Sequence, residues 1–396
     1  MQRNEARGRI LLIDNSCWNV HNFRFPLLQE LTYQDYDVVL ATPMDEYFAK
    51  LDPSFFAKHI ILKKLNRQGR NPFEDLALVG ELLQIIKAEK PDLVLNFTIK
   101  PNIYGSIAAR ILKIPAISVI TGMGYSFLHP RGLMRVVPIL YRIAFQKNKK
   151  IVVYNREDRK LLLEKKFAAP SQCEVILGDG VDTDYFPYNP NQHLSNPPKP
   201  FVFLFIGRLL KDKGILEYVE AAKRLQEKKH KIVCWVLGGL DFGNPAHIHQ
   251  AQVLDWKKKK HIKYLGTSED VRPIIAKAHA IVLPSYREGM PRAILEAMSM
   301  GKPIITTDVA GCSETVEDGE NGFVVPAKNS EALFDSMNNM LVKNHYQLLE
   351  MGERSRQIAI DKFRKEVILS QYITMISSIV DIKSENADTT KENIFA

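Results

Sequence analysis

Several kinds of sequence signal are missing from this chain of 396 residues. Its four cysteines lie far apart and form no C-x-x-C pair, which argues against a zinc site or a disulfide framework and favours a reducing compartment. No segment approaches the roughly 18 consecutive apolar residues that a membrane-spanning helix needs. Residues 1–8 are charged and lack the apolar core of a signal peptide. We therefore expect a cytoplasmic protein without a metal site.

Signals for two common ligand classes are also missing. An NAD enzyme would carry G-x-G-x-x-G after its first strand, and residues 13–24 contain no such pattern. The chain has no helix-turn-helix signal and no aromatic-basic RNA motif. We expect no bound cofactor and no nucleic-acid partner. The 54 Lys and Arg against 45 Asp and Glu, a net charge of +9, suit phosphorylated metabolites or acidic lipid headgroups instead.

The chain does have the length and composition of a two-domain globular protein. Hydrophobic residues make up 45% and charged residues 25%, which excludes general disorder. A single compact core rarely grows to this length. We place an N-terminal domain at 1–177, a linker rich in Asp, Asn and Pro at 178–200, a second domain at 201–362, and a C-terminal helix and tail at 363–396.

Short apolar segments alternate with amphipathic ones in both predicted domains. This alternation indicates parallel sheets covered by helices on both faces. The predicted fold class is α/β, with two doubly wound Rossmann-like domains and a ligand in the cleft between them, outside the carboxyl ends of the strands. The predicted strands are 9–13, 37–41, 92–96, 116–120, 150–154, 201–206, 232–237, 261–264, 280–283 and 303–306; the predicted helices include 22–31, 73–89, 102–112, 215–228, 268–278 and 291–300.

The stretch 283–297 carries the strongest chemical signal. An apolar strand ends at Leu283, and Gly289 follows in a polar loop where backbone can approach a ligand. Pro291 opens a helix, a position where its missing N–H costs nothing. The free N–H groups and positive end of such a helix favour an anion. Glu288 and Glu296 lie on either side of that position; each alone reads as a surface charge, but Gly289 and Pro291 favour a binding site.

A second motif follows the strand at 201–206. Gly207 permits a tight exit from the strand, and Arg208 and Lys213 supply two cations before Gly214 opens a helix. Arginine offers a planar fork for phosphate oxygens and lysine a point charge. Fixed cations of this kind stabilise a departing nucleoside diphosphate without a metal. A solvated basic turn is the alternative interpretation, and Lys211 fits it.

These residues together resemble the retaining nucleotide-sugar glycosyltransferases of family 4, which have the GT-B arrangement of two Rossmann-like domains. Glu288 to Glu296 is similar to the family's E-x7-E motif, and Gly207 to Gly214 to its G-R-x4-K-G element. The matching elements extend from about residue 180 to 323, through Gly-Val-Asp at 180–182, Gly311-Cys-Ser-Glu314 and Asn321-Gly322.

The resemblance implies a role for each matched residue. Arg208 and Lys213 would hold the donor diphosphate, and Glu296 the ribose hydroxyls. Glu288 would contact the donor sugar, and the reaction would need no divalent metal. The backbone around the phosphate and sugar would come from Gly207, Gly289, Met290 and Pro291, and the base contacts from Leu265, Gly266 and Thr267.

The N-terminal half departs from the common family pattern. Many members carry a histidine after the strand at 116–120, where this chain has Thr121-Gly122-Met123-Gly124, so backbone at Gly122 and Met123 would approach the donor. With residues 98–105, this stretch resembles a bacterial subgroup that adds hexoses or N-acetylhexosamines to undecaprenyl-diphosphate-linked saccharides. That implies a UDP-sugar donor and a lipid-linked or oligosaccharide acceptor, used in surface polysaccharide or glycoprotein biosynthesis. Weaker acceptor-side candidates are Asn22, Arg24, Lys100 and Asn102.

A membrane surface is a further predicted partner. The segment 131–150 is basic and apolar, which fits either an amphipathic helix on an anionic bilayer or a core helix with a basic end. Lys63, Lys64, Arg67 and Arg70 form a second basic loop, which fits either a lipid diphosphate acceptor or a solvated surface. We predict peripheral attachment to the inner face of the bacterial cell membrane. A nucleotide-sugar 2-epimerase or hydrolase, or a nucleotide-sugar-binding protein, remains the alternative function.

Overall fold

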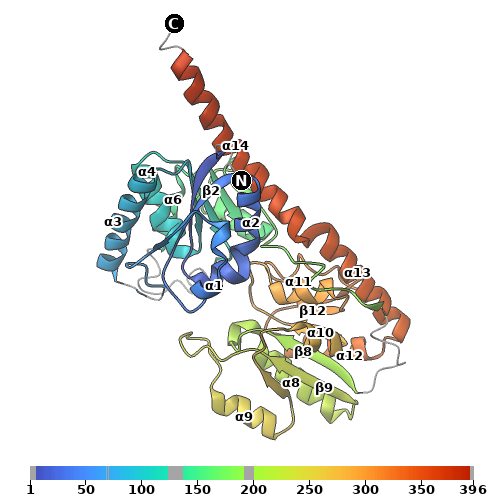
Figure 1. Ribbon diagram of the computed structural model, residues 1–396. Coiled ribbons are helices and arrows are strands. Elements are labelled where there is room, and N and C mark those ends of the chain that lie inside the picture. The colour runs from blue at the N-terminus through green and yellow to red at the C-terminus, as the bar shows by residue number, and fades with distance from the viewer. Residues whose placement is uncertain (1–5, 68, 70, 124–136, 191–199, 393–396) are drawn as a thin grey trace. The chain divides into compact units, whose positions relative to one another are not determined.

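The computed structural model describes residues 6–67, 69, 71–123, 137–190 and 200–392. The chain forms two compact units (Figure 1). The N-terminal unit contains Met1–Asp179 together with Ile368–Ala396, and the C-terminal unit is Gly180–Val367. The chain therefore returns to its first unit after completing the second, whereas the sequence analysis set 363–396 apart as a separate segment.

The N-terminal unit is built on a parallel sheet, seven-stranded over the described residues, in the order β3-β2-β1-β4-β5-β6-β7. The order reverses between β1 and β4, which creates the switch point of a doubly wound fold. Strand β4 and the last four residues of β1 are buried on both faces, as their mostly apolar residues predict. The strands are β1 Gly8–Ile13, β2 Tyr36–Thr42, β3 Lys58–Ile61, β4 Leu93–Phe97, β5 Ala116–Ile120, β6 Lys150–Val153 and β7 Cys173–Val175.

Helices cover both faces of this sheet. One core cluster packs helices α3, α4, α6 and α7 against side chains of the strands. The helical segments are α1 Cys17–Asn19, η1 Val20–Arg24, α2 Phe25–Tyr33, η2 Phe48–Lys50, η3 Pro53–Phe55, α3 Pro72–Glu89, η4 Pro101–Gly105, α4 Ser106–Ile111, α6 Val137–Phe145 and α7 Arg156–Glu164.

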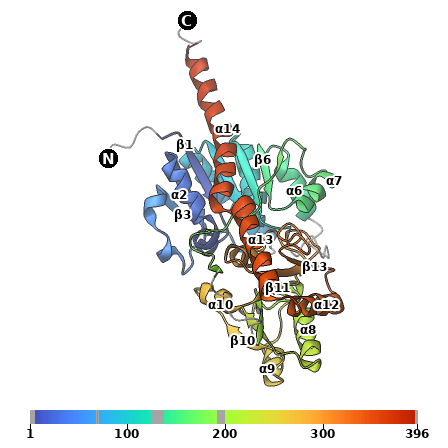
Figure 2. The ribbon, with the colours of Figure 1, turned by 90° about the vertical axis from the view of Figure 1, so that its right-hand side faces the viewer.

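The C-terminal helix α14, Lys365–Glu392, belongs to the N-terminal unit from Ile368 onward. Figure 2 shows it lying across the sheet of that unit. Tyr36 Oη lies 3.0 Å from Ser377 Oγ, and Ile376 on the same helix is fully buried. The helix therefore supplies part of the hydrophobic cover of the first sheet.

The C-terminal unit repeats the same plan. Its sheet is six-stranded over the described residues, with parallel pairings and the order β10-β9-β8-β11-β12-β13, so the switch point lies between β8 and β11. The strands are β8 Phe201–Ile206, β9 Ile232–Leu237, β10 Lys263–Gly266, β11 Ala280–Leu283, β12 Ile304–Thr307 and β13 Gly322–Val325; the helical segments are η7 Lys211–Lys213, α8 Ile215–Glu227, α9 Gln250–Lys258, α10 Arg272–Lys277, α11 Arg292–Ser299, α12 Ser330–Leu341 and α13 His345–Phe363.

The predicted α/β class with two doubly wound Rossmann-like domains is confirmed. Strands β5, β8, β9 and β11 have the predicted bounds. Helix α10 begins at Arg272, four residues after the predicted start, because Asp270 accepts hydrogen bonds from the Arg272 backbone and side chain and ends the preceding loop. Strands β3, β7 and β13 and helix α9 were not predicted.

Candidate functional site

The turn after β8 is shaped by backbone contacts. Gly207 donates its N–H to the Leu237 carbonyl, and Gly238 packs so closely that an added Cβ would lie 1.8 Å from the Gly207 carbonyl oxygen. Only glycine therefore fits at position 238, and Gly238 was not among the residues predicted for the site. The two glycines let the loops after β8 and β9 approach each other at the carboxyl edge of the sheet.

The loops after β8 and β11 also touch, on the two sides of the switch point. Gly214 has a φ of +72°, and a Cβ there would lie 2.0 Å from the Pro284 carbonyl oxygen. Tyr286 donates its N–H to the Asp212 carbonyl at 2.8 Å. These contacts join the two sequence motifs into one site at the place where doubly wound folds bind ligands.

Lys213 and Glu288 meet at this junction. Lys213 Nζ forms an ion pair with Glu288 Oε1, and the side chains are only 20% and 11% exposed. Ser285 Oγ donates to the same carboxylate oxygen at 2.7 Å. Because low exposure limits screening by water, the pair is held more firmly than a surface ion pair. The structure thus brings together two residues predicted from separate motifs, and adds Ser285 to them.

A further close backbone contact fixes the loop of Glu288. Glu288 donates its N–H to the Ala310 carbonyl at 3.1 Å. Gly311 has a φ of +76°, and a Cβ there would lie 2.4 Å from the Gly289 carbonyl oxygen. The loop after β12 therefore holds the loop after β11 in place through contacts between backbone atoms. The sequence motif around Gly311 does not reveal this role.

Helix α11 begins directly after this loop. Pro291 is its N-cap residue, with a φ of −78° and a ψ of 95°, so the helix starts one residue later than predicted. Met290 is partly buried beside it. One helical turn further, Arg292 Nε donates to Glu296 Oε1 at 2.8 Å. Burial raises the pKa of the Glu296 carboxyl, and Arg292 opposes that shift.

The remaining predicted donor residues lie on neighbouring loops of the same unit. Arg208 is half exposed and pairs with Asp241 across a distance of 2.7 Å between Nη1 and Oδ2. Leu265 and Gly266 end strand β10, and exposed Thr267 follows them. Gly266 accepts a hydrogen bond from the Gly238 N–H at 2.7 Å. Asp241 was not identified from the sequence.

Predicted residues in the N-terminal unit follow the carboxyl end of β5. Gly122 is partly buried, and the Met123 side chain is 1% exposed and belongs to the core. A donor contact of Met123 stays a prediction, and with the thioether buried it would have to come from the backbone. Gly124, Arg70 and the first six residues of the basic segment, 131–136, lie outside the described residues.

Arg24 lies in a buried cluster of charged and phenolic groups. It is 3% exposed and forms ion pairs with Asp14 and Asp179, and its Nη1 donates to Tyr154 Oη at 3.1 Å. Burial works against its charge, but the attraction of Asp179, Tyr154 and Asp14 outweighs that effect and raises its pKa. Burial raises the pKa of Asp14, and Arg24 opposes the shift. These contacts do not support the predicted acceptor contact, because the guanidinium is enclosed by the protein's own groups.

The other weak acceptor-side candidates are also engaged within the N-terminal unit. Lys100 Nζ lies 2.6 Å from Asp75 Oδ1, and Tyr104 donates to the other oxygen of that carboxylate. Asn102 is buried and donates to the Val119 carbonyl at 2.9 Å. Asn22 donates to the Trp18 carbonyl at 2.8 Å. Each of these side chains therefore has a structural contact in this unit.

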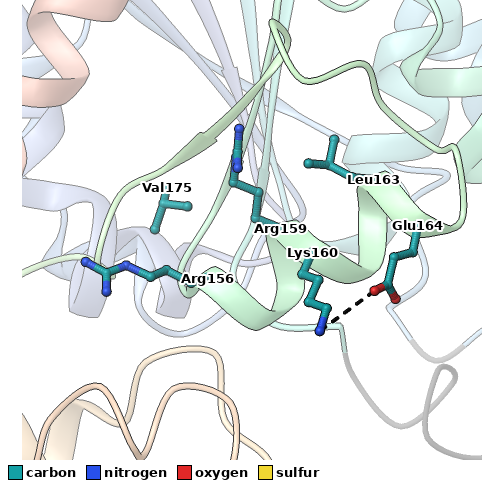
Figure 3. Close-up of a pocket in the computed structure, with 6 residues that line it drawn as sticks. All are labelled: Arg156, Arg159, Lys160, Leu163, Glu164 and Val175. Atoms are coloured by element: carbon teal, nitrogen blue, oxygen red, sulfur yellow. Dashed lines mark ion pairs between the residues drawn. The ribbon is translucent and has the colours of Figure 1, made fainter.

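A cationic pocket of about 450 Å³ lies beside the edge strand β7 (Figure 3). Arg159 ties helix α7 to this strand by donating to the Cys173 carbonyl at 3.1 Å. Three cations against one carboxylate favour an anionic ligand. The pocket was not predicted, although the Arg-x-x-Arg-Lys spacing at 156–160 is visible in the sequence. The lining residues are Arg156, Arg159, Lys160, Leu163, Glu164 and Val175.

The residues at the C-terminal switch point suit an anionic ligand that carries hydroxyl groups. Lys213, Arg208 and Arg292 supply positive charge, while Glu288 and Glu296 accept hydrogen bonds. Across the part of the chain that the structure describes, no group of three or more His, Cys, Asp or Glu side chains is placed to hold a metal ion. Within the same described residues, no helix combines the length and apolar character that crossing a membrane requires.

Comparison with known proteins links this site to a reaction class. Residues 9–155 match the family model described as glycosyl transferase 4-like, and residues 190–358 the model of glycosyl transferases group 1. The chain is 26% identical over 387 residues to the N,N'-diacetylbacillosaminyl-diphospho-undecaprenol alpha-1,3-N-acetylgalactosaminyltransferase of Campylobacter jejuni, covering 94% of this chain and 99% of that protein.

A second relative is the UDP-Gal:alpha-D-GlcNAc-diphosphoundecaprenol alpha-1,3-galactosyltransferase of Escherichia coli, 28% identical over 316 residues, with 76% of this chain and 80% of that protein covered. Among solved structures, Anabaena HepE in complex with UDP and glucose has a TM-score of 0.76 at 20% identity, over 93% of this chain and 99% of that one. The chain is thus a glycosyltransferase of the GT-B fold, with a glycosyl transferase 4-like region followed by a group 1 region.

Proposed function

We propose that this glycosyltransferase moves a hexose or N-acetylhexosamine from a UDP-sugar to a polyprenyl-diphosphate-linked saccharide with retention of anomeric configuration. The observation that carries the proposal is the Lys213–Glu288 pair, which glycine-built loops hold at the switch point of the group 1 region. Relatives named for diphospho-undecaprenol saccharide acceptors support the acceptor class. The product would serve surface polysaccharide or glycoprotein biosynthesis.

On the donor side, each site residue has a distinct proposed task. Arg208 and Lys213 bind the diphosphate, and their fixed charge replaces a divalent metal during departure of the leaving group. Glu296 accepts hydrogen bonds from the ribose hydroxyls, and its low exposure favours a ligand that brings donors to it. Glu288 contacts the donor sugar beside the backbone of 289–291, and residues 265–267 contact the base.

The proposed reaction takes place on one face of the sugar. The bond between the anomeric carbon and the diphosphate oxygen breaks, and the electron pair leaves with UDP. The acceptor hydroxyl oxygen forms the new bond to the same carbon, and its proton passes to the departing diphosphate oxygen. Positive charge from Lys213 and Arg208 stabilises the diphosphate as its negative charge grows.

A lipid-linked acceptor brings the enzyme to a membrane surface. Lys63 and Lys64 are exposed, and their backbone N–H groups donate to the Glu81 carboxylate, which holds this basic loop against helix α3. At the start of that helix Phe73 and Leu76 are 82% and 70% exposed. Basic and apolar side chains in one region suit an anionic bilayer. We propose peripheral attachment to the inner face of the bacterial cell membrane through this region.

Flotation with anionic liposomes tests the membrane proposal. At low salt, the F73S/L76S variant should bind the liposomes much more weakly than wild type does. Wild-type binding should fall as salt is added. Tyr346→Ser, which removes an aromatic residue that is 71% exposed from the C-terminal unit, is the control. Equal flotation of all three proteins would overturn the proposal.

Product analysis tests the proposed reaction. The enzyme is incubated with a panel of UDP-, GDP- and ADP-sugars and a short-chain polyprenyl-diphosphate saccharide, and the lipid product is examined by mass spectrometry and by NMR of its anomeric proton. An α-linked product from one α-configured UDP-sugar is expected. A β-linked product would contradict retention, and release of free sugar or a 2-epimer would favour a hydrolase or an epimerase.

A further inference from the structure

Two loops of the N-terminal unit are fastened together at the carboxyl edge of its sheet. One follows β1 and includes the short helical segments α1 and η1, and the other follows β2, so both begin at the same edge. Cys17 Sγ lies 3.1 Å from Thr42 Oγ1 and contacts the Pro43 carbonyl oxygen at 3.3 Å. The Asp45 carboxylate accepts a hydrogen bond from the backbone N–H of Trp18 at 3.1 Å. The position of Trp18 is thus fixed by both loops.

Four aromatic rings gather where the loops meet. Trp18 packs edge-on against Phe23 and Tyr47, with centroid distances of 5.3 and 6.4 Å, and His21 lies 5.6 Å from Tyr47. We call these four residues the aromatic platform. Edge-to-face contacts of this kind hold the rings in fixed orientations. Despite these neighbours, Trp18 remains 39% exposed, so part of a rigid indole is open to solvent.

Polar groups surround the aromatic platform. Exposed Glu46 lies beside Tyr47, and Lys50 Nζ lies 4.6 Å from the centre of the Tyr47 ring. Asp45 accepts the backbone N–H groups of Trp18 and Tyr47, so its carboxylate lies close to the backbone that carries both rings. An aromatic face bordered by hydrogen-bonding groups suits a ligand with an apolar C–H face and hydroxyls at its edge. The carboxylates disfavour an anionic bilayer at this place, because like charges repel.

We infer that the aromatic platform binds a saccharide ring of the acceptor, with the ring stacked on Trp18. This inference rests on the proposed function, since it names the part of the acceptor that the N-terminal unit recognises. The loops that carry the platform follow β1 and its neighbour β2, and β1 borders the switch point of this sheet, where doubly wound folds receive ligands. Trp18 is a specificity-determining residue in this account.

Kinetics with Trp18→Ala and Trp18→Phe test the inference. The acceptor is a short-chain prenyl diphosphate that carries N-acetylglucosamine. Loss of the stacking surface should raise the KM for this acceptor by about tenfold in W18A, while kcat and the KM for the donor stay near wild type. W18F should recover most of the affinity. Tyr346→Ala, an exposed aromatic of the C-terminal unit, is the matched control. An unchanged acceptor KM in W18A would overturn the inference.

A binding measurement separates this inference from the proposed function. Free N-acetylglucosamine disaccharide is titrated into wild type and W18F, and tryptophan fluorescence is recorded. The other two tryptophans lie in the C-terminal unit: Trp256 is only 8% exposed, and Trp235 on β9 is partly buried with Lys263 Nζ 5.4 Å from the centre of its ring. A saccharide-induced change should therefore come mainly from Trp18 and disappear in W18F. If wild type transfers no sugar to any acceptor, the proposed function fails. The titration would still show whether the aromatic platform binds a saccharide. Identical curves for the two proteins would contradict it.

Discussion

The ammonium group of Lys213 and the carboxylate of Glu288 form an ion pair although 75 positions separate them in the chain. The fold brings them together because Gly214 packs on the Pro284 carbonyl at the switch point of the second sheet. The cation proposed for the leaving group and the carboxylate proposed for the sugar are therefore in place before a donor arrives. Preorganised charges of this kind need little reorganisation during the reaction.

Lys213→Ala should lower kcat/KM for sugar transfer by about 30-fold to 1000-fold, corresponding to about 2–4 kcal/mol of transition-state stabilisation. Initial rates of UDP release in the presence of acceptor measure the effect. Lys211→Ala changes an exposed lysine of the same turn and is the control. Equal rates in both variants would show that Lys213 does not carry leaving-group charge.

Glu288→Gln should lower kcat while leaving the Kd of the donor within a few-fold of wild type. The amide keeps the size of the side chain and can still accept the Ser285 hydrogen bond, but it removes the negative charge beside the sugar. Single-turnover kinetics and calorimetric titration of UDP-sugar separate the two quantities. A large loss of donor binding with normal kcat would assign Glu288 to ground-state binding only.

Gly311→Ala should disturb the loop of Glu288, because its Cβ would lie 2.4 Å from the Gly289 carbonyl oxygen. Gly319→Ala is a matched control: its φ of +83° is similarly unfavourable for alanine, but nothing lies within 4 Å of the new Cβ. Thermal unfolding and transfer rates are compared. We expect G311A to lose clearly more activity and stability than G319A. Equal losses would show that the unfavourable φ of alanine, and not the contact with Gly289, causes the effect.

The strands of both sheets were largely predictable from the sequence, and the departures have identifiable causes. Strands β8 and β11 are continuous apolar runs buried on both faces, so their bounds were predicted correctly. The edge strand β3 has exposed residues at both ends, and β7 spans only three residues, so neither gives a clear periodic signal. Weak patterns of this kind are common at sheet edges.

The candidate site was predictable only in part. Lys213 and Glu288 stand out because glycine and apolar strands flank them in the sequence. Their pairing, and the participation of Ser285 and Gly238, depend on contacts between loops distant in the chain, which no local pattern encodes. Arg24 was predicted to contact the acceptor, but it is buried and forms an ion pair with Asp179. Nothing in the sequence around a single arginine indicates such a distant partner.

Lys302 should make the stability of the C-terminal unit depend on pH. Its side chain is fully buried and donates to the Ala276 carbonyl, and burial lowers its pKa to about 7. Between about pH 7 and 10 the unfolded chain therefore binds more protons at this site, so stability rises with pH by up to about 1.4 kcal/mol per unit. Denaturant unfolding at pH 7 and 9.5 should show this rise in wild type and in the exposed-site control K277M. The same slope in K302M would contradict it.

The most direct test of the account is the release of UDP from a panel of UDP-sugars in EDTA, with and without a prenyl-diphosphate saccharide. We predict that one UDP-sugar releases UDP only when the acceptor is present and that EDTA does not change the rate. Loss of release in EDTA, restored by a divalent metal, would contradict a leaving group stabilised by Arg208 and Lys213. Release that is independent of the acceptor would contradict the proposed transfer.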